Sequence, residues 1–135
     1  MFSTILLIDD DNATNYLHHI YLEEWNICQS IQVAEDGREA LSLIQNTPCL
    51  FKDPNSLILL DINMPIMNGF EFLQAYSLLE SYQKASGVLV MLTTSLSEAY
   101  QQRANQISEI NGFVKKPLIQ EELLAQSRSF LHLRV

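Results

Sequence analysis

The sequence has few cysteines, few basic residues and no long hydrophobic run, and each shortage excludes a class of protein. Its two cysteines, Cys28 and Cys49, form neither a CxxC pair nor a metal-binding spacing, which argues against a disulfide scaffold. No apolar stretch approaches the roughly 20 residues that cross a bilayer, and no basic segment precedes the first apolar run. We therefore expect free thiols and a cytoplasmic protein without a membrane partner.

Basic residues are scarce relative to acidic ones. Eight Lys and Arg stand against 16 Asp and Glu, which gives a formal net charge of −8. This charge repels a phosphate backbone, so we expect no nucleic-acid partner. With four Gly and four Pro the composition is that of an ordinary globular protein. A chain of 135 residues can bury one core, and we expect residues 1–135 to form a single domain without an output domain.

Short β-rich apolar runs alternate with longer amphipathic segments along the whole chain. The predicted strands cover residues 4–8, 30–34, 56–60, 87–94 and 111–117, and the predicted helices cover 12–25, 36–46, 70–83, 97–108 and 119–133. A loop is expected around Pro48 and Pro54. This rhythm favours an α/β fold, a five-stranded parallel sheet of flavodoxin-like order 2-1-3-4-5 with five helices on both faces.

Local patterns give details of these elements. Residues 56–60 are apolar except for Ser56, which predicts a strand in the centre of the sheet. Asn12 and Asp36 are expected to cap the two helices that follow them. Apolar residues at helical spacing predict the inward face of the helix over 12–25, namely Ala13, Tyr16, Leu17, Ile20, Tyr21 and Trp25.

Polar residues stand at the carboxyl end of each of four predicted strands. Asp9 and Asp10 follow the first strand, Asp61 the third, Thr93 and Thr94 the fourth, and Lys116 the fifth. In the order 2-1-3-4-5 the first and third strands are neighbours at the topological switch point, where open sheets bind ligands. We therefore expect the three carboxylates to share one pocket.

Three clustered carboxylates repel one another and need a compensating cation. Carboxylate and carbonyl oxygens suit Mg²⁺ better than zinc. Asp10, Asp61 and the backbone carbonyl of Asn63 can hold the metal, with Asp9 binding through water. Phosphoryl transfer fits this set, because a carboxylate such as Asp61 can act as the nucleophile.

Two further residues suit the same chemistry. Lys116 offers a positive point charge, and Thr93 offers a hydroxyl that can bond a phosphoryl oxygen.

Four segments, "LLIDDDNA", "LILLDINMPIMNGFEFL", "VLVMLTTS" and "GFVKKPL", resemble in content and order the signature segments of the receiver domain of two-component response regulators. The resemblance spans essentially the whole chain and is closest to the stand-alone, chemotaxis type. It implies that Asp61 accepts a phosphoryl group from a histidine kinase or histidine phosphotransfer protein in a Mg²⁺-dependent reaction. Such a domain is a phosphoacceptor in phosphorelay signal transduction and not an enzyme.

The resemblance also implies roles for the other site residues. Asp9 and Asp10 match the acid pair, Thr93 the switch hydroxyl, Lys116 the phosphate-contacting lysine and Phe113 the switch aromatic.

Partner surfaces are implied in the same way. The face formed by residues 97–108, 111–117 and 119–133 would bind an effector, and the helix over 12–25 with the loops around the pocket would bind the kinase. Thr14 and Asn15 are candidate exposed residues there. The Lys116–Pro117 peptide is expected to be cis, and the protein to be a monomer or weak dimer.

Three positions depart from the family's usual residues or tune its chemistry. Thr94 stands where the family favours a smaller residue, and Asn63 and Ser95 stand where it sets the phosphoryl lifetime. Strand alternation favours Lys116 over Lys115 as the pocket lysine.

Some residues have simpler structural interpretations. Met64, Pro65 and Gly69 are expected to form a turn, with Gly69 permitting unusual backbone angles. The histidines, His18, His19 and His132, are expected to be surface or partly buried helix residues.

Other functions stay open beside the receiver hypothesis. A haloacid-dehalogenase-like phosphatase needs an Asp-x-Asp-x-Thr/Val motif, whereas Asp9 and Asp11 are followed by Ala13. A histidine phosphotransfer protein would be all helical. A pseudo-receiver that binds a partner without phosphorylation is the main alternative.

Overall fold

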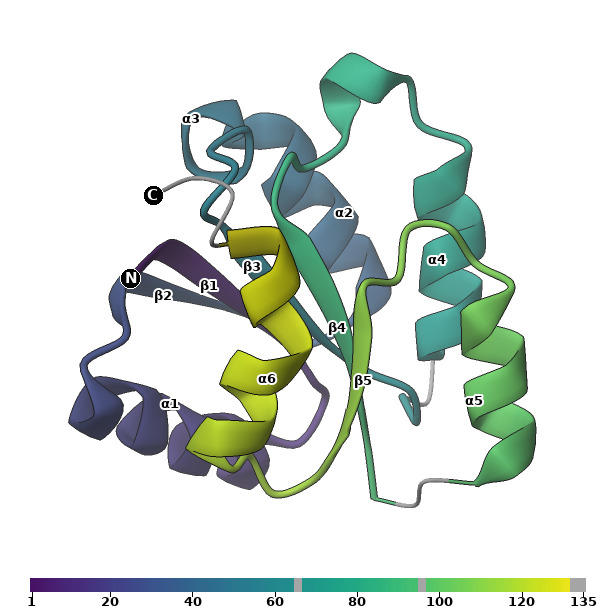
Figure 1. The fold of residues 1–135 in the computed structure, drawn as a ribbon. Helices are drawn as coiled ribbons and strands as arrows, with labels where there is room; N and C mark the ends of the chain where they lie inside the picture. Colours follow the sequence, from purple (N-terminus) through teal and green to yellow (C-terminus); the bar gives the residue numbers. More distant parts are fainter. Residues whose placement is uncertain (65–66, 95–96, 132–135) are drawn as a thin grey trace.

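A computed structural model describes residues 1–64, 67–94 and 97–131 of the protein. Its centre is a five-stranded parallel sheet of order β2-β1-β3-β4-β5, as predicted (Figure 1). The strands are β1 (Phe2–Ile8), β2 (Cys28–Ala34), β3 (Leu57–Asp61), β4 (Val88–Thr93) and β5 (Gly112–Lys115). The prediction that the third strand is central is confirmed, since β3 lies in the middle of this order.

The connections are helical, with two differences from the prediction. The helices are α1 (Asn12–Trp25), α2 (Gly37–Asn46), α3 (Pro48–Phe51), α4 (Gly69–Ser77), α5 (Glu98–Asn105) and α6 (Gln120–Leu131), with a 3-10 turn η1 (Ser81–Gln83). The loop expected around Pro48 contains α3, because proline suits the first position of a helix. The helix expected to reach residue 83 ends at Ser77, since Glu80 is extended.

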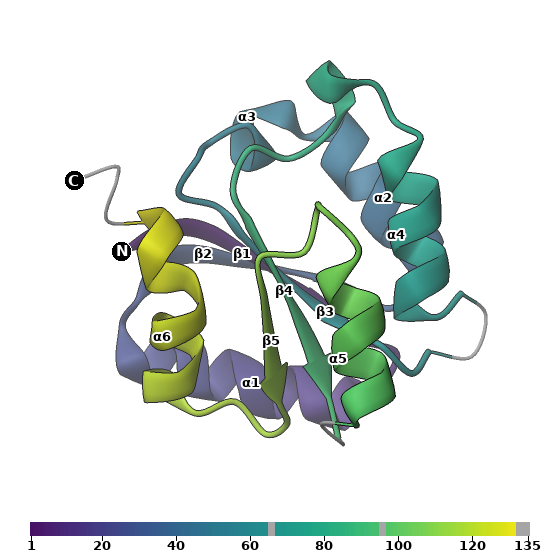
Figure 2. The same ribbon diagram turned by 45° about the vertical axis from the view of Figure 1, so that its right-hand side comes forward.

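Strand alternation divides the core between the two faces of the sheet. Ile5 and Leu7 of β1 pack on the side of α1 and α6, whereas Leu6 and Ile8 pack on the side of α2, α3, α4 and α5. The two layers of helices are visible on opposite sides of the sheet (Figures 1 and 2). Both faces of β1 and β3 are therefore buried, which explains their nearly continuous apolar sequences.

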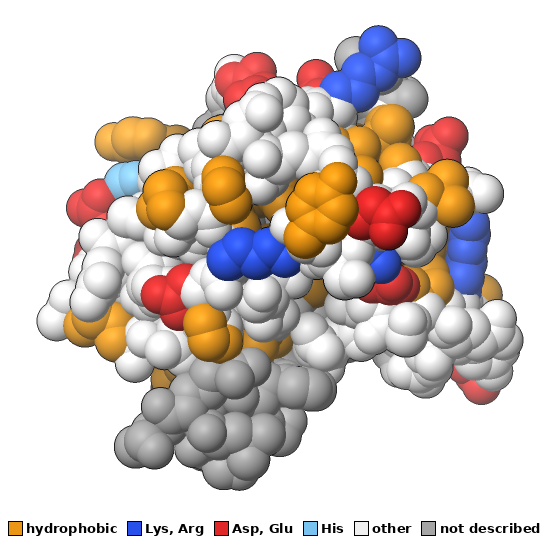
Figure 3. All heavy atoms as spheres, turned by 90° about the horizontal axis from the view of Figure 1, so that it is seen from above, with side chains coloured by type: hydrophobic (Ala, Val, Ile, Leu, Met, Phe, Trp, Pro, Cys, Tyr) orange, Lys and Arg blue, Asp and Glu red, His pale blue; other side chains and the backbone are white. Residues whose placement is uncertain are grey.

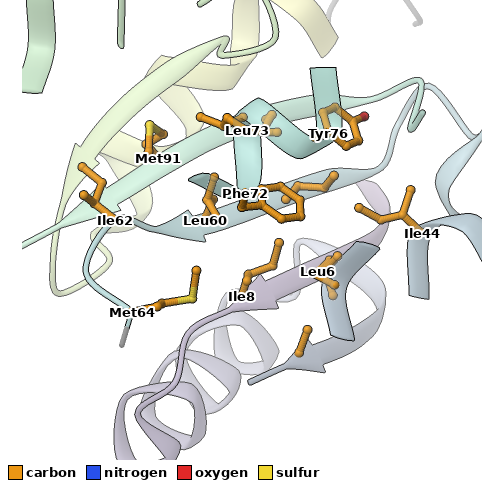
Figure 4. Packing of buried hydrophobic residues seen from close by; sticks show 14 of the residues in the cluster. Leu6, Ile8, Ile44, Leu60, Ile62, Met64, Phe72, Leu73, Tyr76 and Met91 are labelled. Atoms are coloured by element: carbon orange, nitrogen blue, oxygen red, sulfur yellow. The ribbon is translucent and has the colours of Figure 1, made fainter. Parts of the chain in front are cut away.

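The larger cluster lies between the sheet and α2, α3, α4 and α5. Phe72 of α4 is fully buried over Leu60 of β3 and Ile8 of β1 (Figure 4). Tyr76 stacks on Phe72 with ring centroids 5.7 Å apart, and its hydroxyl accepts a hydrogen bond from the Ala85 amide. These contacts hold α4 against the central strands.

Helix α1 only partly turns the predicted face to the sheet: Tyr21 and Trp25 pack against the core, but the fully buried residues are others. Its buried residues are Asn15, His18 and Leu22, while Tyr16 is 72% and Leu17 is 40% exposed. The prediction counted apolar residues and so missed a stripe in which two of three members are polar. The helix begins at Asn12 as predicted, but its N-cap is Asp11 and not Asn12, because the Asp11 carboxylate accepts a hydrogen bond from the Ala13 amide.

Gly69 is required for close packing and not for an unusual backbone angle. In the described residues no glycine has a positive φ. A Cβ on Gly69 would lie 2.7 Å from the Asp61 carbonyl oxygen and 2.9 Å from the Ile62 Cα. The predicted reason for this glycine was wrong, and the structural one is that the first turn of α4 touches the end of β3. Pro65, which was predicted to form a turn with Gly69, lies outside the described residues. His132 also lies outside them.

The end of the sheet where the strands begin carries α3 and η1. Seen from above Figure 1, hydrophobic, basic and acidic side chains are interspersed there (Figure 3). Cys49 of α3 is exposed and Cys28 at the start of β2 is partly buried, and both are free thiols. Within the described ranges, none of the helices is both long and apolar enough to span a bilayer.

Candidate functional site

Three carboxylates meet at the end of the sheet where the strands finish. Asp9 follows β1 and Asp61 is the last residue of β3, and each is only 3% exposed, while Asp10 is exposed. One carboxylate oxygen from each of the three lies within 4.8 Å of the others. The prediction that they share a pocket is confirmed.

The parallel pairing of β1 between β2 and β3 brings these residues together. Ile8 pairs with Leu60, so the residues that follow each strand project at the same edge. The Asp9 amide donates to the Ala34 carbonyl oxygen at 3.1 Å, which extends β1 along β2. Asp61 and Asp9 are 52 positions apart in the sequence (61 − 9), and sheet order alone makes them neighbours.

Lys116 bridges the two buried carboxylates. Its Nζ lies 2.6 Å from Asp9 Oδ2 and 2.9 Å from Asp61 Oδ1. Its amide donates to the Thr93 carbonyl oxygen at 2.7 Å, which fixes the backbone beside the pocket. Lys115 is exposed, as strand alternation predicted. The Lys116–Pro117 peptide is cis, which matches the expectation.

Burial and like charge make the Asp61 carboxylate costly to ionise. Burial and, to a smaller degree, the negative charge of Asp9 raise the pKa of Asp61, and the hydrogen bond from Lys116 lowers it; together they place this pKa at about 6. Burial disfavours the charge of Lys116, but the hydrogen bonds to Asp9 and Asp61 outweigh it and raise the pKa of the lysine. One lysine therefore compensates only part of the negative charge.

The donor set fits Mg²⁺. All side-chain oxygens offered by the cluster are carboxylate oxygens, which hard cations prefer, and one of them, on Asp10, is open to solvent. Asn63 follows two residues after Asp61, and its amide donates a hydrogen bond to the Asp61 carboxylate. The loop after β3 is thus folded back toward the cluster.

The remaining predicted residues differ in how deeply they are buried. Thr93 is fully buried at the end of β4, and Thr94 is exposed. Phe113 of β5 is half-buried and packs against the cluster beneath α4 and α5. Ser95 lies outside the described residues.

Two site neighbours were misjudged from the sequence. Asn15 was expected to be exposed, but it is 5% exposed and its Nδ2 donates to the Asp9 carbonyl oxygen at 2.8 Å. His18, expected at the surface or partly buried, is 1% exposed. Burial, together with the positive charge of Lys116, lowers the pKa of His18 to about 4. Asn15, His18 and Leu22 recur at helical spacing, which was the signal in the sequence for a buried stripe. Asn15 and His18 are polar, so a search for apolar residues does not find it.

Comparisons with known proteins agree with this geometry. The profile of the response regulator receiver domain matches residues 5–128. The chain is 30% identical over 121 residues to the probable chemotaxis protein CheY of Rhizobium etli, covering 90% of this chain and 86% of that protein. It is 32% identical over 127 residues to the transcriptional regulatory protein CpxR of Escherichia coli K12, covering 94% of this chain and 48% of CpxR.

A solved structure shows the same arrangement. The two-component response regulator from Cytophaga hutchinsonii superposes with a TM-score of 0.86 at 27% identity, covering 97% of this chain and 98% of that one. The chain spans about half the length of several curated relatives, so the absence of an output domain stays a prediction. The matched profile, the sheet order and the acidic pocket lead to one conclusion: this chain belongs to the response regulator receiver domain family.

Proposed function

We propose that Asp61 accepts a phosphoryl group from a histidine kinase or histidine phosphotransfer protein. The observation that carries this proposal is the ion pair of Lys116 with both Asp9 and Asp61, at 2.6 and 2.9 Å. This arrangement holds a carboxylate nucleophile and a positive charge on one side of an open acidic pocket. A phosphoryl group bound to Asp61 would find Lys116 within reach of its oxygens.

The transfer exchanges one bond to phosphorus for another. A carboxylate oxygen of Asp61 forms a bond to phosphorus while the bond between phosphorus and the donor imidazole nitrogen breaks. The imidazole keeps the electron pair and takes a proton from water. Asp61 must be ionised to attack, and near pH 7 it is, because its pKa is raised only to about 6.

Asp10, Asp61 and the Asn63 carbonyl would hold Mg²⁺, with Asp9 acting through water. When bound, the ion supplies positive charge to the phosphoryl oxygens. The protein's own contribution is to gather three carboxylates, of which two, on Asp9 and Asp61, are buried and already oriented by Lys116.

Phosphorylation would be read through Thr93 and Phe113. The Thr93 hydroxyl would bond a phosphoryl oxygen, and Phe113 would turn inward into the space released. A hollow of about 200 Å³ lies beside Phe113. It is bordered by Ala104 of α5, by Gln126 of α6 and by Ile110, which precedes β5. A change of the Phe113 ring would therefore alter the surface of α5, β5 and α6, where we expect an effector to bind.

Exposed apolar side chains support a docking role for the elements that flank the pocket. Tyr16 is 72% and Leu17 40% exposed on α1, and Ile119, which follows the loop after Lys116, is 46% exposed. We propose that the kinase or phosphotransfer protein contacts them. A cytoplasmic location stays a prediction.

Incubation with acetyl phosphate, with and without Mg²⁺, followed by intact mass measurement tests the proposal. We expect a gain of one phosphoryl group that needs Mg²⁺ and is absent in Asp61→Asn. Asp53→Asn is the matched control, because Asp53 lies before β3 at the opposite end of the sheet and its carboxylate accepts a hydrogen bond from the Asn55 amide at 2.8 Å. This control should take up the group like the unmodified protein.

A folded protein that binds Mg²⁺ but gains no mass would contradict the proposal and favour the pseudo-receiver. In that case binding of a partner would be unaffected by Asp61→Asn.

A further inference from the structure

The three consecutive aspartates are fixed in unequal ways. Asp9 is paired with Lys116, and Asp11 accepts hydrogen bonds from the Ala13 amide and the Thr14 hydroxyl at 3.1 and 2.7 Å. Across the described ranges, neither a hydrogen bond nor an ion pair holds the carboxylate of Asp10. Its position therefore depends on the backbone on either side of it.

That backbone is held by Asn15. The Asp9 carbonyl belongs to the same planar peptide unit as the Asp10 amide, so fixing the direction of this carbonyl fixes the plane from which the Asp10 side chain departs. Asn15 Nδ2 donates to this carbonyl oxygen at 2.8 Å. The Asp11 amide donates to Asp9 Oδ1 at 3.0 Å, which secures the other side of Asp10.

The orientation of the Asn15 amide follows from its neighbour. A rotated amide would bring Oδ1 against the Asp9 carbonyl oxygen, and two acceptors would repel each other. In the observed orientation Oδ1 is buried, and the described part of the chain offers it no hydrogen-bond partner. A residue chosen for stability alone would not leave a buried acceptor unpaired.

We propose that Asn15 is a positioning residue that sets the Mg²⁺ affinity of the site by orienting the Asp9–Asp10 peptide. It need not touch the metal or the phosphoryl group. This inference rests on the proposed Mg²⁺-dependent phosphorylation of Asp61.

The test compares Asn15→Leu with the unmodified protein by calorimetric titration with MgCl₂ and by the rate of phosphorylation from acetyl phosphate. Leucine is similar in size and cannot donate to the Asp9 carbonyl. We expect the dissociation constant for Mg²⁺ to rise about tenfold. The substitution leaves the Asp9 carbonyl oxygen without this donor but also removes the unpaired Oδ1, so the two effects on the melting temperature oppose each other and the net change should be small.

Thr4→Val is the matched control. Thr4 lies near the other end of β1, is 2% exposed, and its hydroxyl is 2.8 Å from the hydroxyl of Ser30. Its loss removes a buried hydrogen bond from the same strand, so the melting temperature should fall while the Mg²⁺ affinity stays unchanged.

A dissociation constant within about twofold of the unmodified value would overturn the inference, since outer partners of metal ligands change affinity by more. Asn15→Ser, whose hydroxyl is too short to reach the carbonyl, gives the same test if the leucine variant does not fold. Failure of the proposed function is distinguishable, because the unmodified protein would then take up no phosphoryl group while its Mg²⁺ affinity could still be compared.

Discussion

Burial shifts two titrations at this site in opposite directions. The pKa of Asp61 is raised from 3.8 to about 6, and that of His18 is lowered from 6.5 to about 4. Between about pH 6 and pH 3.8, Asp61 is protonated to a greater extent in the folded state than in the unfolded state, so the free energy of unfolding rises as the pH falls. For His18 the unfolded state binds the proton first, so stability falls with the pH. The contributions of Asp61 and His18 to the pH dependence of the free energy of unfolding therefore largely cancel.

In Asp61→Asn, the pH dependence of stability that His18 contributes should no longer be offset by Asp61. From about pH 7 to about pH 4.5 the variant should lose free energy of unfolding more steeply than the unmodified protein, by on the order of 1 kcal/mol per pH unit. Without metal it should be the more stable of the two near neutral pH, because it lacks a buried carboxylate that is costly to ionise. Urea unfolding at a series of pH values measures both effects.

The control variants separate titration from a change of net charge. Asp53→Asn removes a carboxylate far from Lys116. Its curve of unfolding free energy against pH should run parallel to that of the unmodified protein. His18→Leu should give the opposite deviation, with stability rising toward acid pH. Parallel curves for Asp61→Asn and the unmodified protein would show that the Asp61 pKa is not raised.

At the scale of single residues, the sequence predicted which charged side chains meet better than it predicted which polar side chains are buried. Asp9, Asp61 and Lys116 were predicted from strand ends, and their meeting follows from sheet order. Asn15 and His18 could not be identified, because a polar residue on the inward stripe of a helix looks like part of a solvated face. Only the packed neighbours reveal which face is inward.

At the scale of elements, the contact between α4 and the end of β3 links packing to the site. Gly69→Ala should be destabilising by about 1–3 kcal/mol, because its Cβ would meet the backbone of Asp61 and Ile62 at 2.7 and 2.9 Å. Backbone atoms cannot move aside cheaply, so α4 or the end of β3 must shift. Phosphorylation from acetyl phosphate should slow as Asp61 is displaced.

Gly37→Ala is the comparison for this prediction. The three atoms nearest to a Cβ there all belong to the Met67 side chain, whose flexible end can move. Gly37 begins α2, where alanine favours the helix. This variant should keep its stability and phosphorylation rate, and equal effects of the two substitutions would contradict the packing argument.

Element boundaries were predicted only in part. Asp36 caps α2 as predicted, whereas the capping box of Asn68 and Glu71 that begins α4 was not identified from the sequence. The end of α4 and the short α3 were missed. Apolar residues continue past Ser77 without a glycine or proline to stop the pattern, so only the extended backbone of Glu80 marks the break.

At the scale of the whole molecule, the acidic pocket couples metal binding to folding. Its carboxylates come from β1 and β3 and meet only when the sheet is complete. Mg²⁺ at about 100 times its dissociation constant should therefore raise the free energy of unfolding by about 2.7 kcal/mol. Thermal unfolding with MgCl₂, against NaCl of equal ionic strength, measures the shift.

Asp10→Asn provides the control for that measurement. Asp10 is exposed and unpaired within the described ranges, so its loss should leave the metal-free melting temperature nearly unchanged while reducing the Mg²⁺ shift. A shift that persists undiminished in this variant would place the stabilising ion elsewhere.

The overall fold was predictable because several patterns agree. Alternating apolar runs and amphipathic segments required a parallel sheet, and right-handed crossovers required helices on both faces. The nearly continuous apolar run in β3 indicated its central place. The division of the core between two helical layers then follows from the alternation of side chains along each strand.

The exposed Cys49 on α3 gives the protein a chemical handle at the end of the sheet away from the acidic pocket. Burial and the charge of Glu23 raise the pKa of the Cys28 thiol, so less of it is thiolate at a given pH. A maleimide dye or spin label should therefore attach first to Cys49. Surface immobilisation or fluorescence reporting through this thiol would leave the aspartates, the lysine and the surface around Phe113 free of added groups.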